Sequence, residues 1–158
     1  GFNNMFKLIT LLMSRFIGIL FLVLVCTSFK INLFEKSEIK IQGVNWPFTV
    51  CGNGSWDFSA LTLQQVPTRN SINAIILEGV ANDYIEFVKS DISVKLNGLF
   101  LHSESIDFKN IYDNGDVIEF KYSTNIPSFA PSGTYMIQFS FKEANGKENG
   151  CVSFTFKL

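Results

Sequence analysis

The sequence predicts an all-β fold, an antiparallel β-sandwich of about seven strands. After Phe29 no run of helical period continues for three turns, and short runs of alternating apolar and polar residues dominate instead. Gly, Asn, Asp, Ser and Pro separate these runs at short intervals. Strands of this length and spacing are typical of a two-sheet sandwich.

Each expected strand is bounded by turn residues. The longest run contains Ser90 and Asp91, where we expect a bulge or break. Val66-Pro67 and Gly79 end two other runs, and the segment 113–116 (DNGD) is a hairpin turn signal. The expected strands are 39–41, 56–63, 72–77, 85–101, 117–123, 134–142 and 151–158.

Large aromatic residues fall on one face of the later strands. In the run 117–123, Ile118, Phe120 and Tyr122 alternate with polar residues, so one sheet face carries all three side chains. The chain contains 17 Phe residues, and many occupy such inward positions. Two interpretations remain open from the residues alone: an ordinary packed core, or a Phe-lined gap between the sheets that takes an apolar ligand.

The first 28 residues differ in composition from the rest. Lys7 and Arg15 precede the apolar run FIGILFLVLV at 16–25, and small residues follow at 26–28. This pattern predicts a cleaved signal peptide over 1–28, with a retained membrane anchor as the alternative. We expect a lead-in strand over 29–44 and one domain over 45–158.

An oxidising compartment would follow from that signal. Cleavage removes Cys26 and changes the net charge from −1 to −3, and it leaves only Cys51 and Cys151, a hundred residues apart. Asn53 begins the sequon Asn53-Gly54-Ser55, so we expect glycosylation there. The sequence therefore predicts a protein that is secreted or lies in the endolysosomal lumen.

The composition argues against nucleic-acid binding and metal chemistry. A net charge of −1 without a basic run gives no surface for nucleic acid. His102 is the single histidine, so a histidine metal cluster is excluded. The acidic residues Glu104, Asp107, Asp113 and Asp116 lack calcium-loop spacing, and a solvated turn explains them.

Catalytic motifs are missing as well. The chain has no nucleophile elbow and no phosphate-binding loop. His102 lies beside Ser103, Glu104 and Ser105, but consecutive residues of a strand point to opposite faces, so they do not make a triad. We therefore expect no enzyme activity, no metal and no cofactor.

Three motifs, at 46–52, 126–139 and 145–156, follow one another in a fixed order. They resemble the motifs of the ML lipid-recognition family, which includes Niemann–Pick type sterol carriers and phosphatidylglycerol/phosphatidylinositol transfer proteins. The first is WPFTVCG at 46–52, and Pro67 then closes a strand. The second is I-P-x-x-x-P-x-G-x-Y-x-I-x-F at 126–139, and the third is N-G-x₄-C-V-x-F-x-F at 145–156. Together they cover essentially all of 45–158.

The resemblance implies an immunoglobulin-like sandwich whose sheets are splayed around one lipid, with Cys51 and Cys151 joined in a disulfide. The implied portal lies between two short apolar segments, and the implied cavity lies behind it. The portal residues are Leu99, Phe100, Leu101, Ile126, Pro127, Phe129, Ala130 and Pro131. The cavity residues are Ile92, Val94, Leu96, Ile118, Phe120, Tyr122, Ile137, Phe139, Phe154 and Phe156.

The chain also departs from the family pattern, because two further disulfides found in many members are absent. Without the middle one, we expect mobile loops around 102–114. The function expected is non-catalytic binding and transfer of one lipid or sterol, with transient membrane contact and no known protein partner. The alternative is an immunoglobulin-like ectodomain with a filled core that acts as a protein-interaction or receptor-accessory module.

Overall fold

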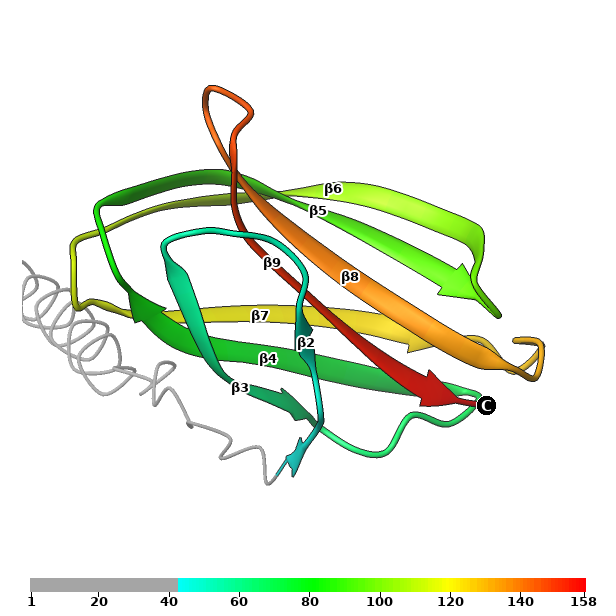
Figure 1. Ribbon diagram of the computed structural model, residues 1–158. Coiled ribbons are helices and arrows are strands. Elements are labelled where there is room, and N and C mark those ends of the chain that lie inside the picture. Colours follow the sequence, from blue (N-terminus) through cyan, green and yellow to red (C-terminus); the bar gives the residue numbers. More distant parts are fainter. Residues whose placement is uncertain (1–42) are drawn as a thin grey trace, which may run out of the picture. The chain divides into compact units, whose positions relative to one another are not determined.

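The computed structural model describes residues 43–158, which form two packed antiparallel β-sheets (Figure 1). One sheet has the order β1-β3-β4-β7 and the other has the order β2-β9-β8-β5-β6. The strands are β1 (Val44–Asn45), β2 (Thr49–Val50), β3 (Trp56–Leu63), β4 (Ser71–Ala81), β5 (Ile85–Leu96), β6 (Leu99–Tyr112), β7 (Val117–Ile126), β8 (Thr134–Glu143) and β9 (Glu148–Lys157). The predicted all-β sandwich is confirmed.

The predictions for the beginning of the chain lie outside the described residues. These are the signal peptide or anchor over 1–28, most of the lead-in strand over 29–44 and the run at 39–41. Within residues 43–158 no helix is long and apolar enough to span a membrane.

The strand count differs from the prediction, because the short strands β1 and β2 were not expected and the middle of the chain holds two strands instead of one. The run 85–101 is not one strand, because the chain reverses at Asn97 and Gly98, which have φ angles of 52° and 83°. Leu96 pairs with Leu99, so β5 and β6 form a hairpin with a two-residue turn. The register of β5 against β6 shifts between Phe87 and Lys89 and again between Val94 and Lys95, rather than at Ser90 and Asp91.

The segment predicted as mobile loops, 102–114, is mostly strand. β6 continues to Tyr112 and pairs with β5 along most of its length. Its alternation is hard to recognise in the sequence because β6 is an edge strand with polar residues on both faces, and most of its side chains are exposed.

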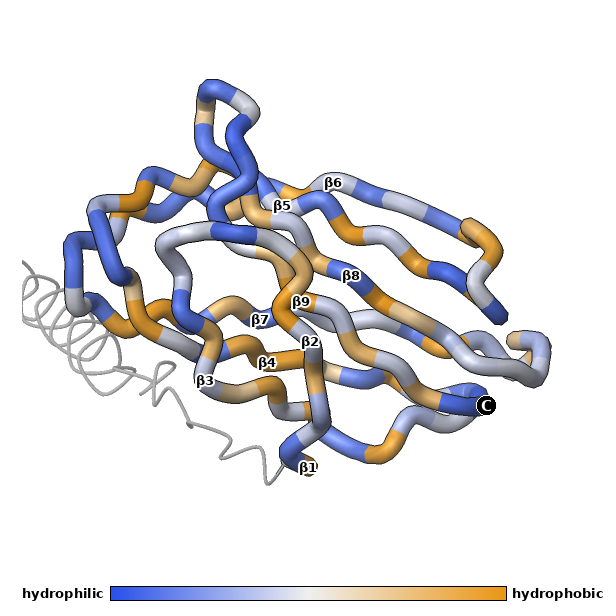
Figure 2. Tube along the Cα trace, viewed as in Figure 1, coloured by the Kyte–Doolittle hydropathy of each residue, from blue (hydrophilic) through white to orange (hydrophobic). Residues whose placement is uncertain are grey.

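Aromatic rings fill one half of the space between the sheets. Figure 2 shows the apolar residues alternating along β3, β4, β8 and β9. Phe141 of β8 contacts Trp56 of β3 and Phe120 of β7, with ring centroids 4.6 Å and 4.9 Å apart. Phe108 of β6 contacts Phe120 edge to face at 5.0 Å. In this half the core is packed, as one of the two interpretations of the sequence predicts.

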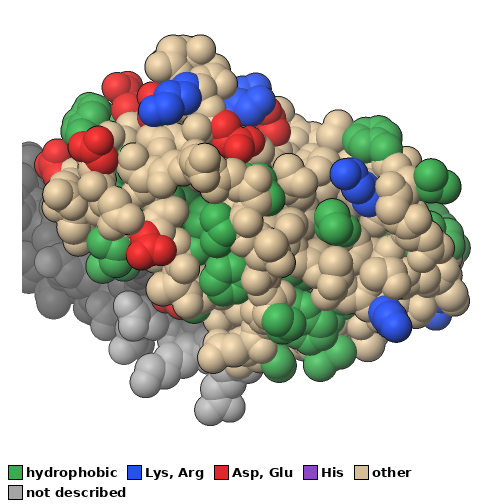
Figure 3. Space-filling view, viewed as in Figure 1, with side chains coloured by type: hydrophobic (Ala, Val, Ile, Leu, Met, Phe, Trp, Pro, Cys, Tyr) green, Lys and Arg blue, Asp and Glu red, His purple; other side chains and the backbone are tan. Residues whose placement is uncertain are grey.

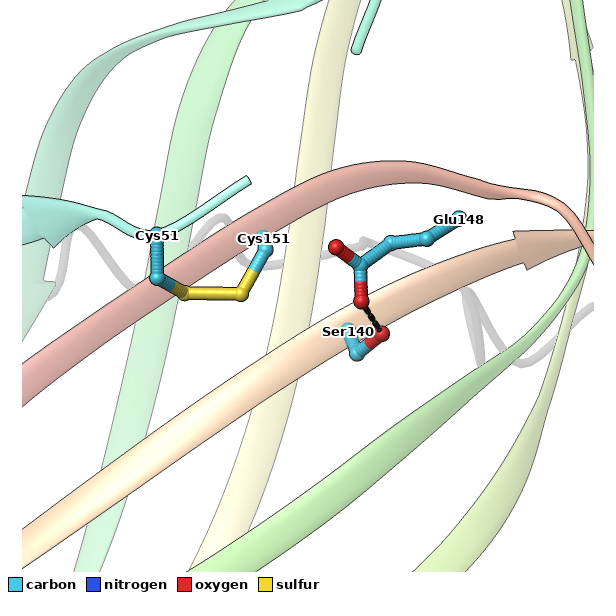
Figure 4. The surroundings of a disulfide bond; sticks show 4 residues. All are labelled: Cys51, Ser140, Glu148 and Cys151. Atoms are coloured by element: carbon cyan, nitrogen blue, oxygen red, sulfur yellow. Dashed lines mark hydrogen bonds between the residues drawn. A yellow bond between two sulfur atoms is a disulfide. The ribbon is translucent and has the colours of Figure 1, made fainter. Parts of the chain in front are cut away.

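The Cys51–Cys151 disulfide that the resemblance implies is present (Figure 4). The Cα atoms lie 5.1 Å apart, and the Cys51 N–H donates to the Cys151 carbonyl over 3.0 Å. A Cβ at Gly52 would lie 2.9 Å from the Cys151 Cβ, so the residue after Cys51 must be small. Trp46 also ties this segment to β9, since its Nε1 donates to the Thr155 carbonyl over 2.8 Å.

Candidate functional site

A cavity of about 370 Å³ lies between the two sheets, where β7 ends and β8 begins. Its walls come from β5, β6, β8 and β9 on one side and from β7 and the following loop on the other. The lining residues are Val94, Leu101, His102, Thr124, Asn125, Ile126, Pro127, Ala130, Tyr135, Ile137, Phe156 and Leu158. The volume falls within the range of about 300–1,000 Å³ that is common for small-molecule sites.

Along β5 and β7, smaller inward side chains take the place of aromatic ones at this end, which leaves space for the cavity. Along β5 the inward residue is Phe87 in the packed half and Val94 at the cavity. Along β7 the sequence changes in the same way, from Phe120 to Thr124. Packed side chains leave space wherever their summed volume falls short. The cavity therefore results from the small size of the inward-facing side chains near the ends of β5 and β7.

Aromatic contacts support the far wall. The rings of Tyr135 and Phe156 stack with centroids 5.3 Å apart. The Tyr135 hydroxyl donates to the Pro131 carbonyl over 2.9 Å, which leaves the ring face towards the interior. A buried tyrosine whose hydroxyl is paired presents an apolar surface to a ligand.

The loop after β7 is held in one position by Arg69. The Arg69 Nε donates to the Ala130 carbonyl over 2.8 Å, and a terminal nitrogen donates to the Ser132 hydroxyl over 2.6 Å. Ile126 and Ala130 are each 7% exposed, whereas Phe129 is 85% exposed. The loop therefore turns small apolar residues inward and one aromatic ring outward.

The β5–β6 hairpin supplies a second exposed apolar segment at this end of the sandwich. Leu99, Phe100 and Leu101 are 76%, 66% and 51% exposed. Asn97 fixes the hairpin to β8, since its Oδ1 accepts from the Thr134 N–H over 2.9 Å. Figure 3 shows hydrophobic side chains at this end, on the right, as well as elsewhere on this face, whereas the visible acidic side chains lie on the left and at the top.

The predicted portal residues divide between the cavity wall and the surface. Leu101, Ile126, Pro127 and Ala130 line the cavity. Leu99, Phe100 and Phe129 are exposed beside it, and Pro131 accepts the bond from Tyr135.

The ten predicted cavity residues divide between the walls of cavities and the packed core. Val94, Ile137 and Phe156 line the cavity, and Phe154 lines a small second cavity next to it. Leu96 and Tyr122 are partly buried against the core. The other four, which are 3% exposed or less, lie in the packed core and are Ile92, Ile118, Phe120 and Phe139.

Several lining residues were not predicted from the sequence. Thr124 continues the alternation of Ile118, Phe120 and Tyr122 along β7, and this pattern would have found it. Tyr135 shares a face with Ile137 for the same reason. Leu158 continues the alternation of Val152, Phe154 and Phe156 in the same way. His102 and Asn125 carry no comparable signal, because their places depend on how strands from both sheets meet.

A polar contact joins the two sheets beside the cavity. The Tyr122 hydroxyl of β7 donates to the Glu104 carboxylate of β6. Partial burial, together with this carboxylate, raises the pKa of Tyr122 to about 12. The tyrosine therefore stays neutral and keeps donating throughout the physiological pH range.

No group of three or more His, Cys, Asp or Glu residues in the part from Gly43 onward is arranged to hold a metal ion. In the turn before β7, the Asp113 N–H donates to the Asp116 carboxylate over 2.8 Å. These acidic side chains serve the turn that joins β6 and β7.

Comparisons with known proteins identify the fold. No family model and no curated protein matches the chain. A Niemann-Pick type C2 protein from Japanese carpenter ant matches with a TM-score of 0.57 and 15% identity, covering 71% of this chain and 98% of that one. The C-terminal domain of wzt matches with a TM-score of 0.53 and 20% identity, covering 70% and 75%.

A structure of chicken MD-1 complexed with lipid IVa also matches, with a TM-score of 0.47 and 14% identity, covering 71% and 97%. That likeness is too weak to carry an argument about this chain. The first match spans nearly the whole of the ant protein. The described domain therefore has the fold of a Niemann-Pick type C2 protein, the fold that the sequence resemblance predicts.

Proposed function

We propose that this protein binds one lipid or sterol in the cavity between its sheets and transfers it without chemical change. The observation that carries the proposal is an apolar cavity of about 370 Å³, bordered by exposed apolar segments. The fold shared with a Niemann-Pick type C2 protein supports it. No covalent step is required of any residue.

Burial of apolar surface supplies the binding energy. Each buried methylene group contributes about 0.8 kcal/mol relative to water. Because a membrane offers the ligand nearly the same gain, exchange between membrane and protein is close to balanced. The protein then acts by lowering the barrier of passage through water.

The exposed residues next to the cavity would make the transient contact with a membrane. Phe129 and Phe100 are large, apolar and mostly exposed, and they lie on the two segments that border the cavity. Exposed aromatic residues on a rigid loop are suited to contact with an apolar surface. The ligand would pass between these segments.

We also propose that the protein passes through an oxidising compartment on its way to the place where it acts. The Cys51–Cys151 disulfide fits secretion or an endolysosomal location. Asn53 is exposed in the loop after β2, so its sequon is accessible for glycosylation. Mass spectrometry of protein from a eukaryotic secretory host would report the glycan and the cleavage site together.

Binding can be tested by filling the cavity. Val94→Phe places an aromatic ring in the cavity wall, and we expect binding of an apolar fluorescent dye, and its displacement by lipid, to weaken at least tenfold. The melting temperature should stay the same or rise, because the ring fills space that is already present. Val117→Phe is the matched control, since Val117 is 74% exposed and does not line this cavity.

Two results would contradict the proposal. Equal dye binding by Val94→Phe and the wild type would place the ligand elsewhere. A wild-type protein that takes up neither dye nor lipid would favour the interaction module with a filled core.

A further inference from the structure

Asn73 of β4 is a polar residue buried beside the apolar cavity. Its side chain is 2% exposed. It lines a second cavity of about 10 Å³, which shares the wall residues Thr124, Ile126, Ile137 and Phe156 with the larger one. The small cavity therefore adjoins the proposed lipid site.

The hydrogen bonds of Asn73 fix the direction of its amide. The Asn73 Nδ2 donates to the Gln65 carbonyl over 3.0 Å, and only the nitrogen of an amide can donate. The Oδ1 must then point away from Gln65. Among residues 43–158 this buried oxygen has no hydrogen-bond partner. An unpaired acceptor in an apolar interior destabilises a fold unless something bound supplies a donor.

A second polar group lies directly opposite. Asn73 pairs with Thr124 in the β4–β7 register, and both side chains face the interior. Residues opposite each other in an antiparallel pair have neighbouring side chains. The Thr124 hydroxyl can donate and accept, and Tyr122 lies two residues before it on the same face of β7. A polar strip thus crosses one wall of the apolar site, from Asn73 through Thr124 to Tyr122.

We propose that the ligand is an uncharged amphiphile with a hydroxyl group, which binds with that hydroxyl inward and donates to the Asn73 Oδ1. The inference rests on the proposed function. An acceptor selects a donor, so an alcohol fits where a ketone, an ether or an ester does not. A space of about 10 Å³ admits a group of the size of one water molecule, which suits a hydroxyl and excludes a phosphate headgroup.

The test compares two probes of nearly equal length in the wild-type protein: dodecanol and dodecyl methyl ether. We expect dodecanol to bind about three- to tenfold more tightly by titration calorimetry, the range of one net hydrogen bond. Asn73→Leu replaces the amide by an apolar group of similar size, and the preference for the alcohol should disappear. Ether binding should change little, because its apolar contacts remain.

A second variant covers the case in which Asn73→Leu does not fold, since that change also removes the bond to Gln65. Thr124→Val keeps the side-chain shape, and we expect it to reduce the preference for dodecanol. Ser123→Ala is the control, because Ser123 is exposed on the outer face of β7.

The outcomes separate the two proposals. If both probes bind the wild type equally well, the inward hydroxyl is wrong, a bound water molecule satisfies Asn73, and the lipid-binding proposal stands. If neither probe binds, both proposals fail together.

Discussion

The size of single inward residues decides where the interior is packed and where it is open. Phe87, Phe108 and Phe141 contact one another in the packed half, with ring centroids 5.5–5.8 Å apart. Val94 and Thr124 occupy corresponding inward positions at the cavity. A period of two identifies the inward face of a strand but says nothing about how side chains from two sheets add up in volume.

Asp91 gives the clearest electrostatic prediction at this scale. A hydrogen-bonded ion pair with Lys142, at 2.7 Å, is the largest of the effects that lower the pKa of Asp91 from 3.8 to about 2, and the Ser105 hydroxyl adds to it. Because its pKa is lower in the folded state, the ionised carboxylate stabilises the fold at every pH above its pKa in the unfolded chain. We expect Asp91→Asn to reduce the free energy of unfolding at pH 7 by about 1 kcal/mol, allowing for partial exposure.

The difference between Asp91→Asn and the wild type should close as the pH falls from 3.8 towards 2, where the wild-type carboxylate takes up its proton. Urea unfolding at a series of pH values measures this. Asp107→Asn is the control, because its pair with Lys109 is long at 3.8 Å and exposed, and it should show no such change. If the difference in free energy of unfolding between Asp91→Asn and the wild type stayed the same down to pH 2, the lowered pKa of Asp91 would be wrong.

Phe129 tests the proposed membrane contact. The residue is 85% exposed, so Phe129→Asp should leave the melting temperature unchanged. We expect lipid transfer between vesicles to slow at least tenfold, because a charged group replaces the ring that enters the membrane surface. Val66→Asp, at a 55% exposed position on another loop, is the matched control. Equal transfer rates for wild type and Phe129→Asp would remove this loop from the portal.

At the scale of elements, most strands were predicted closely and the β5–β6 hairpin was not. The strands at 56–63 and 134–142 have clean alternation and turn residues at their ends, and the structure differs from them by one residue at most. The turn at Asn97 and Gly98 is a known hairpin signal within a longer apolar pattern. The pattern continued across the turn because Leu96 and Leu99 pair directly.

The turn of that hairpin requires a positive φ angle at Gly98. Its φ is +83°, and no atom lies within 4 Å of where a Cβ would be, so a substitution there strains only the backbone. We expect Gly98→Ala to lower the free energy of unfolding by about 1 kcal/mol, measured by urea denaturation. Ser103→Ala on exposed β6 should have almost no effect. If the two variants are equally stable, the hairpin turn is not as described.

The position of the loop 127–133 could not be predicted from the pattern of any single strand or loop. Its position depends on Arg69, which lies 61 residues before Ala130 in the chain and donates to its carbonyl. No local pattern links two such positions. Which side chains of an apolar loop turn inward is therefore a property of the folded molecule.

For the whole molecule, the disulfide joins the first part of the domain to its last strand. In the chain-entropy model, closing a loop of about 100 residues contributes about 4–5 kcal/mol. That is comparable to the net stability of about 5–15 kcal/mol of a typical domain. We expect the double variant Cys51→Ala, Cys151→Ala, which leaves no free thiol in the domain, to melt at a sharply lower temperature.

The same loss should follow from adding a reductant to the wild type, measured by circular dichroism. Identical melting curves with and without reductant would mean that the bond does not hold the fold. The Val50→Thr variant is the control, since Val50 is 51% exposed and is the last residue of β2, directly before Cys51.

The sandwich and most strand positions could be predicted from the sequence, because the alternation period and turn chemistry are local properties of the chain. The disulfide and the apolar segments of the portal were predicted through the family resemblance, which depends on the order of three motifs along the chain. The tertiary structure alone decided that only one half of the Phe-rich interior is open, and that Asn73 and Thr124 meet beside that opening. Cavity volume and unpaired polar atoms arise where side chains of different strands fit together, and this fit is not encoded in any single segment.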